Sequence, residues 1–172
     1  MWTSPETDFT AFELDEIFWF IERRRECENG VNTYVMTMIS RKPRQIVAFA
    51  VDKSKAAATI QRMVDSVPPA ERYYTDGYYG YANIDFVGRH MRNATNKNDT
   101  HLIESTNADL RHYIPGLRRR SRIFYRTLET FRAVLSVFIN AYNKFGHAKM
   151  KYYQRYPNAG RELSFSLFDY LS

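Results

Sequence analysis

Cysteine is almost absent from this chain, since Cys27 is the only one among 172 residues. A single thiol excludes a disulfide framework and any cysteine-based zinc site, so we expect a reducing compartment. Long hydrophobic runs are also missing: the longest uncharged stretch with apolar helical spacing, residues 133–143, has 11 residues. A bilayer-spanning helix needs about 20. The N-terminus has no apolar stretch behind a basic one, so the sequence predicts no secretion signal, no membrane partner and a cytoplasmic location.

Acidic residues are scarce in the second half of the chain. Residues 1–86 carry 10 basic and 13 acidic side chains, whereas residues 87–172 carry 15 basic and 6 acidic ones. Six arginines and no carboxylate lie between Leu110 and Arg126. This polarity predicts a polyanion as partner of the second half; a basic surface kept for solubility is the alternative.

The length is that of one domain, and a hydrophobic content of 44% is sufficient for a full core. No internal repeat or long linker divides the chain. We expect a polar lead-in at 1–10, a folded domain at 11–146 and a C-terminal extension at 147–172.

The first half of the domain predicts three strands, a helix and a fourth strand. Segments rich in branched and aromatic residues indicate strands at 11–21, 32–40 and 45–51, which their short connections arrange as an antiparallel meander. The period then becomes helical from residue 56 to residue 67, and Pro68-Pro69 ends that helix. A short strand at 72–75 stops at Asp76-Gly77.

The second half is mostly helical by its pattern. We expect a short helical or irregular piece at 78–86, one more strand at 88–94, and a helix from about Thr100 to Tyr113. A last helix has an apolar seam made of Phe124, Leu128, Phe131, Leu135, Phe138, Tyr142 and Phe145. That seam indicates either a core helix or a contact in a homo-oligomer. The order of elements is the ribonuclease H-like plan, an α/β fold with a mixed sheet and C-terminal helices.

Three acidic residues stand out by their positions in these elements. Asp15 lies inside the first strand, Asp76 follows the fourth, and Glu104 lies near the start of a helix. Reactive groups gather at the carboxyl ends of strands, so neighbouring first and fourth strands would bring Asp15 and Asp76 together. Close carboxylates repel one another unless a cation joins them, and two Mg²⁺ or Mn²⁺ ions suit oxygen ligands and cleavage at phosphorus. Taken singly, each acid fits an ordinary edge, turn or helix-start position as well.

Arg111 follows Glu104 by seven residues, which places both on one helix face two turns apart. A guanidinium there suits a phosphate backbone entering the site, although a plain surface arginine has the same spacing. The four histidines show no metal-ligand spacing. Tyrosines on both sides of Asp76 suit either base stacking or packing.

These motifs resemble the catalytic region of the bacterial insertion-sequence-one transposases. The resemblance covers roughly residues 11–146 and is carried by residues 13–16, 74–77, Glu104 with Arg111, and the basic residues Arg118, Arg119, Arg120 and Arg122. It implies that Asp15, Asp76 and Glu104 bind two Mg²⁺ or Mn²⁺ ions in a ribonuclease H-like fold. The implied activity is metal-dependent DNA strand cleavage and strand transfer, with the arginines holding phosphates.

The chain departs from that family in two respects. Relatives usually carry a zinc module and a helix-turn-helix upstream, and neither fits before residue 11. The basic run also has four arginines in five positions where lysine, serine and threonine are more usual. We therefore expect a separate or fused end-recognition module, and a nucleoid-associated protein. Two alternatives stay open: a ribonuclease H-like nuclease that cuts RNA in a hybrid, and a catalytically silent nucleic-acid-binding remnant of a transposon.

Overall fold

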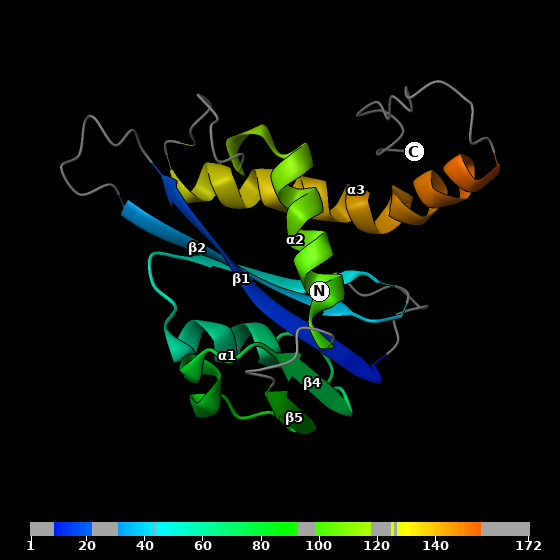
Figure 1. Cartoon of the computed structure of the whole chain (residues 1–172). Coiled ribbons are helices and arrows are strands. Elements are labelled where there is room, and N and C mark those ends of the chain that lie inside the picture. The colour runs from blue at the N-terminus through cyan, green and yellow to red at the C-terminus, as the bar shows by residue number, and fades with distance from the viewer. Residues whose placement is uncertain are drawn as a thin grey trace.

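The chain folds around one five-stranded sheet (Figure 1). The structure, a computed structural model, describes residues 9–21, 31–42, 44–92, 99–117, 125 and 127–155. The sheet has the strand order β3-β2-β1-β4-β5. In chain order the elements are β1 (Ala11–Ile21), β2 (Val31–Ser40), β3 (Ile46–Asp52), α1 (Ala57–Asp65), β4 (Arg72–Thr75), the 3-10 turn η1 (Tyr79–Asn83), β5 (Arg89–Arg92), α2 (His101–Tyr113), the 3-10 turn η3 (Pro115–Leu117) and α3 (Leu128–Arg155).

The sheet is mixed. β1 pairs antiparallel with β2, and β2 pairs antiparallel with β3, which confirms the predicted meander. On its other edge β1 pairs parallel with β4, which in turn pairs parallel with β5. Helix α1 makes the crossover from β3 to β4. The first and fourth strands are therefore neighbours, as predicted.

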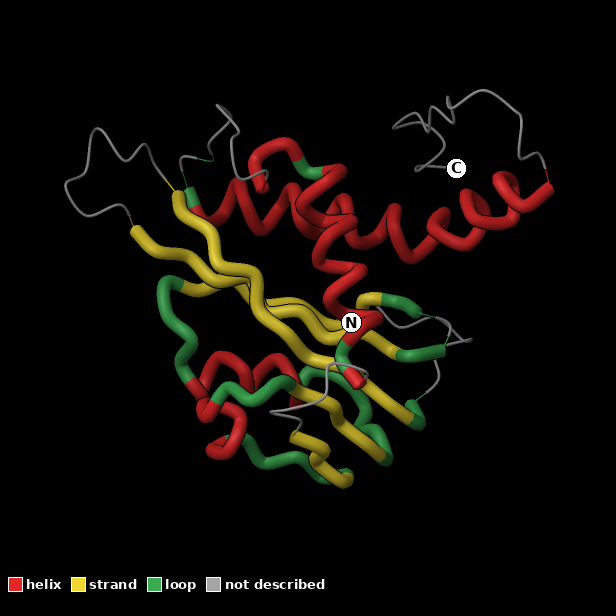
Figure 2. Tube along the Cα trace, in the orientation of Figure 1, coloured by secondary structure: helices red, strands yellow, loops and turns green. Residues whose placement is uncertain are grey.

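Helices cover both faces of the sheet, α1 on one face and α2 with α3 on the other (Figures 1 and 2). The side chains of a strand alternate between faces, so β1 contributes to two separate cores. Phe12 and Leu14 pack with the buried residues of α1. Ile17 and Trp19 pack with those of α2 and α3.

Helix α1 buries the face that its sequence predicts. Thr59, Ile60, Met63 and Val64 are its buried residues, at helical spacing. The Oγ of Ser66 donates a hydrogen bond to the carbonyl of Met63 at 2.7 Å, which satisfies a carbonyl at the end of the helix. Two prolines follow, and the chain then enters β4.

Helix α3 belongs to the core of its own chain. Phe131, Leu135 and Ile139 are fully buried, with Phe138 and Tyr142 packed partly against them. The helix begins at Leu128, and the residues of the expected seam from Leu128 to Tyr142 pack in this core. The structure adds Ile139, a fully buried residue that the expected seam lacks. The predicted boundary at residue 146 falls inside α3, and Phe124 lies outside the described residues.

Asn143 of α3 contacts the outer edge of the sheet. The backbone N–H of Ile46 donates to its Oδ1 at 2.9 Å, and its Nδ2 donates to the carbonyl of Ile46 at 2.8 Å. In the part of the chain that the structure describes, no helix combines the length and apolar character needed to cross a membrane.

Candidate active site

Asp15 and Asp76 lie on neighbouring parallel strands. Leu14 of β1 is paired with Thr75, the last residue of β4, and the two aspartates are the next residues along each chain. The Oδ1 of Asp76 accepts a hydrogen bond from the backbone N–H of Tyr78 at 2.9 Å, which fixes the turn that leaves β4. The structure thus brings together the two acids that the sequence analysis placed side by side.

The carboxyl group of Asp15 is perturbed. Burial raises its pKa to about 6, and the nearby negative charges of Glu16 and Asp76 act in the same direction. Hydrogen bonds from the backbone of Glu16 and from the side chain of Asn107 oppose this shift without cancelling it. A partly desolvated carboxylate beside a second one is an arrangement that a bound cation would stabilise.

Asn107 of α2 is the residue that reaches Asp15 from the helix above the sheet. Its Nδ2 donates to the Oδ2 of Asp15 at 2.8 Å, and its Oδ1 accepts from the hydroxyl of Thr37 at 2.9 Å. Thr37 is directly opposite Asp15 in the β1–β2 pairing. Both Asn107 and Thr37 are buried, so one polar chain connects the helix, β2 and the acid.

Glu104 and Arg111 lie on the same helix as Asn107. Glu104 is exposed in the first turn of α2, and Arg111 is half-buried in the last. Residues 104, 107 and 111 fall within roughly 60° around the helix axis, since each residue advances about 100°. Among the described contacts, none joins Glu104 to Asp15 or Asp76, so its place in the predicted triad stays a prediction.

A different polar group occupies the α1 face of β1. Glu16 points away from Asp15, and its Oε2 accepts from the Nζ of Lys55 at 2.9 Å. The Nζ of Lys55 also lies 4.4 Å from the ring centre of Tyr78. Burial would lower the pKa of Lys55, but the bond and charge of Glu16 outweigh it and raise that pKa. Burial, with the charges of Glu16, Asp15 and Asp76, holds the pKa of Tyr81 well above its usual range.

The oxygen donors of this site suit a hard divalent cation. Mg²⁺ takes one or two protein carboxylates and keeps several waters, and the pair Asp15 and Asp76 supplies that number. Within residues 9–21, 31–42, 44–92, 99–117, 125 and 127–155, no three His, Cys, Asp or Glu side chains are grouped to hold a metal ion. Two ions held by the full triad are therefore still a prediction.

The remaining predicted residues are the arginines of the basic run and the tyrosines around Asp76. Arg118, Arg119, Arg120 and Arg122 lie outside the described residues. Of the tyrosines around Asp76, Tyr73, Tyr74 and Tyr81 are buried in packing, and Tyr79 is 71% exposed.

Sequence reasoning missed several residues that shape this site. Glu13 and Glu16 flank Asp15 in the same short motif, and Asn107 lies between Glu104 and Arg111 on one helix face. The strand alternation of that motif indicates that Glu13 and Asp15 share a face. Helical spacing alone would likewise have grouped Asn107 with Glu104 and Arg111.

Comparisons with known proteins inform the fold alone. No protein-family model and no curated protein sequence matches the chain. The chain is similar to a chain in the cryo-EM structure of the simian T-cell lymphotropic virus intasome in complex with the PP2A regulatory subunit B56 gamma. Its TM-score is 0.56 at 11% sequence identity, over 81% of this chain and 50% of the other. This chain therefore spans about half the length of that solved chain, and the two are alike in fold.

Proposed function

We propose that the chain is a ribonuclease H-like polynucleotidyl transferase, the catalytic domain of a DNA transposase similar to the insertion-sequence-one family. It would perform metal-dependent DNA strand cleavage and strand transfer. The observation that carries the proposal is the pair Asp15 and Asp76, adjacent on two parallel strands. Burial raises the pKa of Asp15, and the charge of Asp76 adds to that shift.

The topology supports the proposal. A meander of three antiparallel strands, a crossover helix and two strands parallel to β1 make up the ribonuclease H-like plan. The likeness to a chain of a viral intasome structure points to the same, integrase-like class of activity.

The orientation of α2 supports a role for Glu104. Thr106 and Ser105 face Arg44, on the β2–β3 side of the helix. Glu104 precedes Ser105 and Thr106 by roughly 100° and 200° around the axis, so it lies away from the flank that faces Arg44. β4 is the neighbour of β1 on the side away from β2, so we expect the flank of α2 that carries Glu104 to face β4 and Asp76.

Each residue then has a defined part in the reaction. Asp15 and Asp76 would hold the divalent ions, with Glu104 completing the ligand set from α2. Bound there, Mg²⁺ or Mn²⁺ supplies activation of an attacking oxygen and charge stabilisation at phosphorus. Arg111, roughly 20° from Glu104 around the helix, would bind a DNA phosphate. The arginines at 118, 119, 120 and 122 would hold further phosphates without reading sequence.

The test is cleavage of duplex DNA by the purified chain in Mg²⁺ or Mn²⁺, with Asp76→Asn as the variant. The amide keeps the shape of the side chain and loses the charge that holds the cation, so cleavage should disappear while folding and DNA affinity persist. Asp65→Asn, at an exposed position on α1, is the matched control and should cleave normally.

Each result bears on one reading of the site. Substantial cleavage by Asp76→Asn would remove Asp76 from the site. Preference for an RNA–DNA hybrid over duplex DNA would point to the ribonuclease H-like nuclease instead. Metal binding without turnover would indicate a catalytically silent remnant.

A further inference from the structure

Two polar contacts join α2 to β1 at matching intervals. The backbone N–H of Ile103 donates to the Oε2 of Glu13 at 2.8 Å, and the side chain of Asn107 donates to Asp15 at 2.8 Å. Two residues along a strand span about 6.8 Å. Four residues along a helix span about 6 Å. The distance from Glu13 to Asp15 along the strand therefore matches the distance from Ile103 to Asn107 along the helix. Together the two contacts fix the position of α2 along β1.

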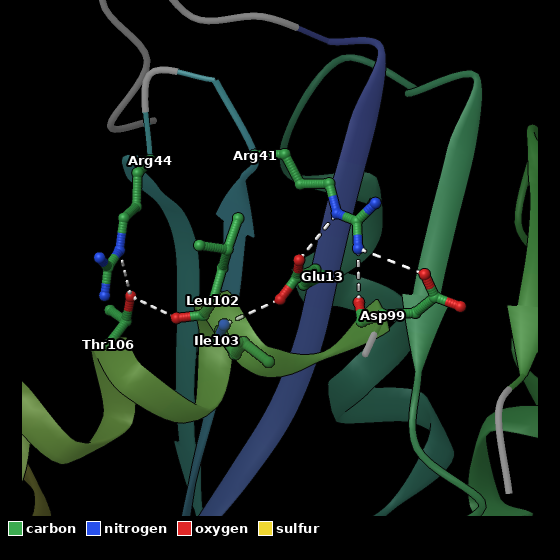
Figure 3. A network of polar contacts seen from close by, with 7 residues as sticks. All are labelled: Glu13, Arg41, Arg44, Asp99, Leu102, Ile103 and Thr106. Atoms are coloured by element: carbon green, nitrogen blue, oxygen red, sulfur yellow. Dashed lines mark hydrogen bonds and ion pairs between the residues drawn. The ribbon is translucent and has the colours of Figure 1, made fainter. Parts of the chain in front are cut away.

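The Glu13 contact has a structural explanation. Glu13 is fully buried, and the Nε of Arg41 lies 2.7 Å from its Oε1 (Figure 3). Arg41 also donates to the carbonyl of Asp99 at 2.8 Å and lies 4.0 Å above the ring of Tyr74. α2 has no side-chain cap of its own, so the Glu13 carboxylate satisfies one of the unpaired N–H groups at its start.

The Asn107 contact is of another kind, because it ends on a residue of the candidate active site. The Thr37 hydroxyl donates to Oδ1 of Asn107, which leaves Nδ2 facing the carboxylate. The reverse orientation would set an amide oxygen against an ionised acid. Asn107 is 2% exposed and Thr37 is 0% exposed, so water cannot replace either partner easily.

We propose that Asn107, oriented by Thr37, is a positioning residue that holds the Asp15 carboxylate in its metal-binding orientation. Oδ2 of Asp15 is engaged by the amide, and the carboxylate is thereby prevented from rotating as it accepts a cation. The inference rests on the proposed function, since it assigns Asp15 to a divalent cation. Partners that orient metal ligands are commonly worth about 10–100-fold in metal affinity.

The experiment measures Mn²⁺ binding to the full chain by electron paramagnetic resonance, without DNA. Asn107→Ala should weaken Mn²⁺ binding by at least about tenfold. Thr37→Val keeps the shape of the side chain and removes the hydroxyl, so it should weaken binding in the same direction. Thr37→Ser, which keeps the hydroxyl, should restore it. The double variant Asn107→Ala, Thr37→Val should bind no worse than Asn107→Ala, because both act through one contact.

Glu13→Gln is the matched control for helix position. It weakens the other anchor of α2 and should lower the unfolding temperature while leaving Mn²⁺ affinity within about twofold. Circular dichroism of each variant checks that it is folded; should Asn107→Ala fail to fold, the Thr37 pair still decides the question.

Two results would overturn the inference while the proposed function stands. One is unchanged Mn²⁺ affinity in folded Asn107→Ala or in Thr37→Val. The other is an equal loss in Glu13→Gln, which would assign the effect to the position of α2 as a whole. Failure of the proposed function looks different: the unaltered chain would bind no Mn²⁺, or Asp76→Asn would bind it equally well, and the inference would fall with it.

Discussion

The ammonium group of Lys55 lies 2.9 Å from the Oε2 of Glu16, on the opposite face of β1 from Asp15. The Glu16 side chain is 2% exposed and that of Lys55 is 28% exposed. The other oxygen of Glu16, Oε1, is buried and has no hydrogen-bond partner among the described residues. Lys55 is therefore the main compensation for the Glu16 charge, and the charge of Asp76 also helps to raise the pKa of Lys55.

Lys55→Met should destabilise the fold, because it leaves the Glu16 carboxylate buried without its counter-charge. Breaking a fully buried ion pair typically lowers the free energy of unfolding by about 3–5 kcal/mol. The loss here should be somewhat smaller, since Lys55 is partly exposed. Urea unfolding measures it. The double variant Glu16→Gln, Lys55→Met should recover most of the loss, and a single variant as stable as the original chain would contradict this account.

Asp15→Asn should stabilise the metal-free chain at neutral pH. The pKa of Asp15 is raised from 3.8 to about 6 in the folded chain, so its contribution to stability is fully present below pH 3.8 and is lost as the pH rises through about 6. Above that pH the charged Asp15 lowers the free energy of unfolding by on the order of 3 kcal/mol relative to a neutral residue. Thermal unfolding in the presence of a chelator, from pH 4 to pH 8, should show that the stability advantage of Asp15→Asn over the original chain grows with pH. The same difference at every pH would contradict the shift.

Glu104→Gln should abolish metal-dependent cleavage with little effect on the fold. Glu104 is exposed in the first turn of α2, where a negative charge contributes only about 0.3–1 kcal/mol. Unfolding and cleavage measured on the same preparation separate the two effects. Glu129→Gln, in the first turn of α3, is the control for the loss of a helix-start acid. Full activity of Glu104→Gln would exclude Glu104 from the ligand set.

Replacing Arg118, Arg119, Arg120 and Arg122 together by glutamine should weaken binding to all DNA sequences alike. Each lost phosphate contact should flatten the dependence of log affinity on log salt by roughly 0.9. Fluorescence anisotropy over a range of salt concentrations measures this slope. An unchanged slope would show that these arginines serve another purpose.

Much of the fold could be predicted because local patterns and packing agree. The strand at 11–21 was predicted at the bounds that β1 has, and Pro68-Pro69 lie just beyond α1 as expected. The last helix shows what a pattern leaves out. The residues of its predicted seam are four and three residues apart in turn, which is a period of 3.5 residues. A straight helix turns once in 3.6 residues. The drift is about 20° per heptad, which helps to bring Ile139 into the core beside the partly buried Phe138.

The candidate site could be predicted only in part, for a physical reason. Asp15 and Asp76 follow from strand order and from the pairing of the first residues of two parallel neighbours, Ala11 of β1 with Arg72 of β4. The contacts of Glu13 with Ile103 and of Asn107 with Asp15 span 90 and 92 residues. They depend on how α2 sits along β1, and a sequence pattern does not give that position.

The contact of Asn143 with Ile46 has a consequence for association between chains. β3 is an edge strand, and such strands can recruit a strand from another molecule through their unpaired backbone groups. At Ile46 the N–H and the carbonyl are already occupied by one amide side chain, which imitates the hydrogen bonds of a missing neighbour. Strand addition along β3 would first have to displace Asn143 at that residue, so this contact protects the edge against sheet-to-sheet aggregation.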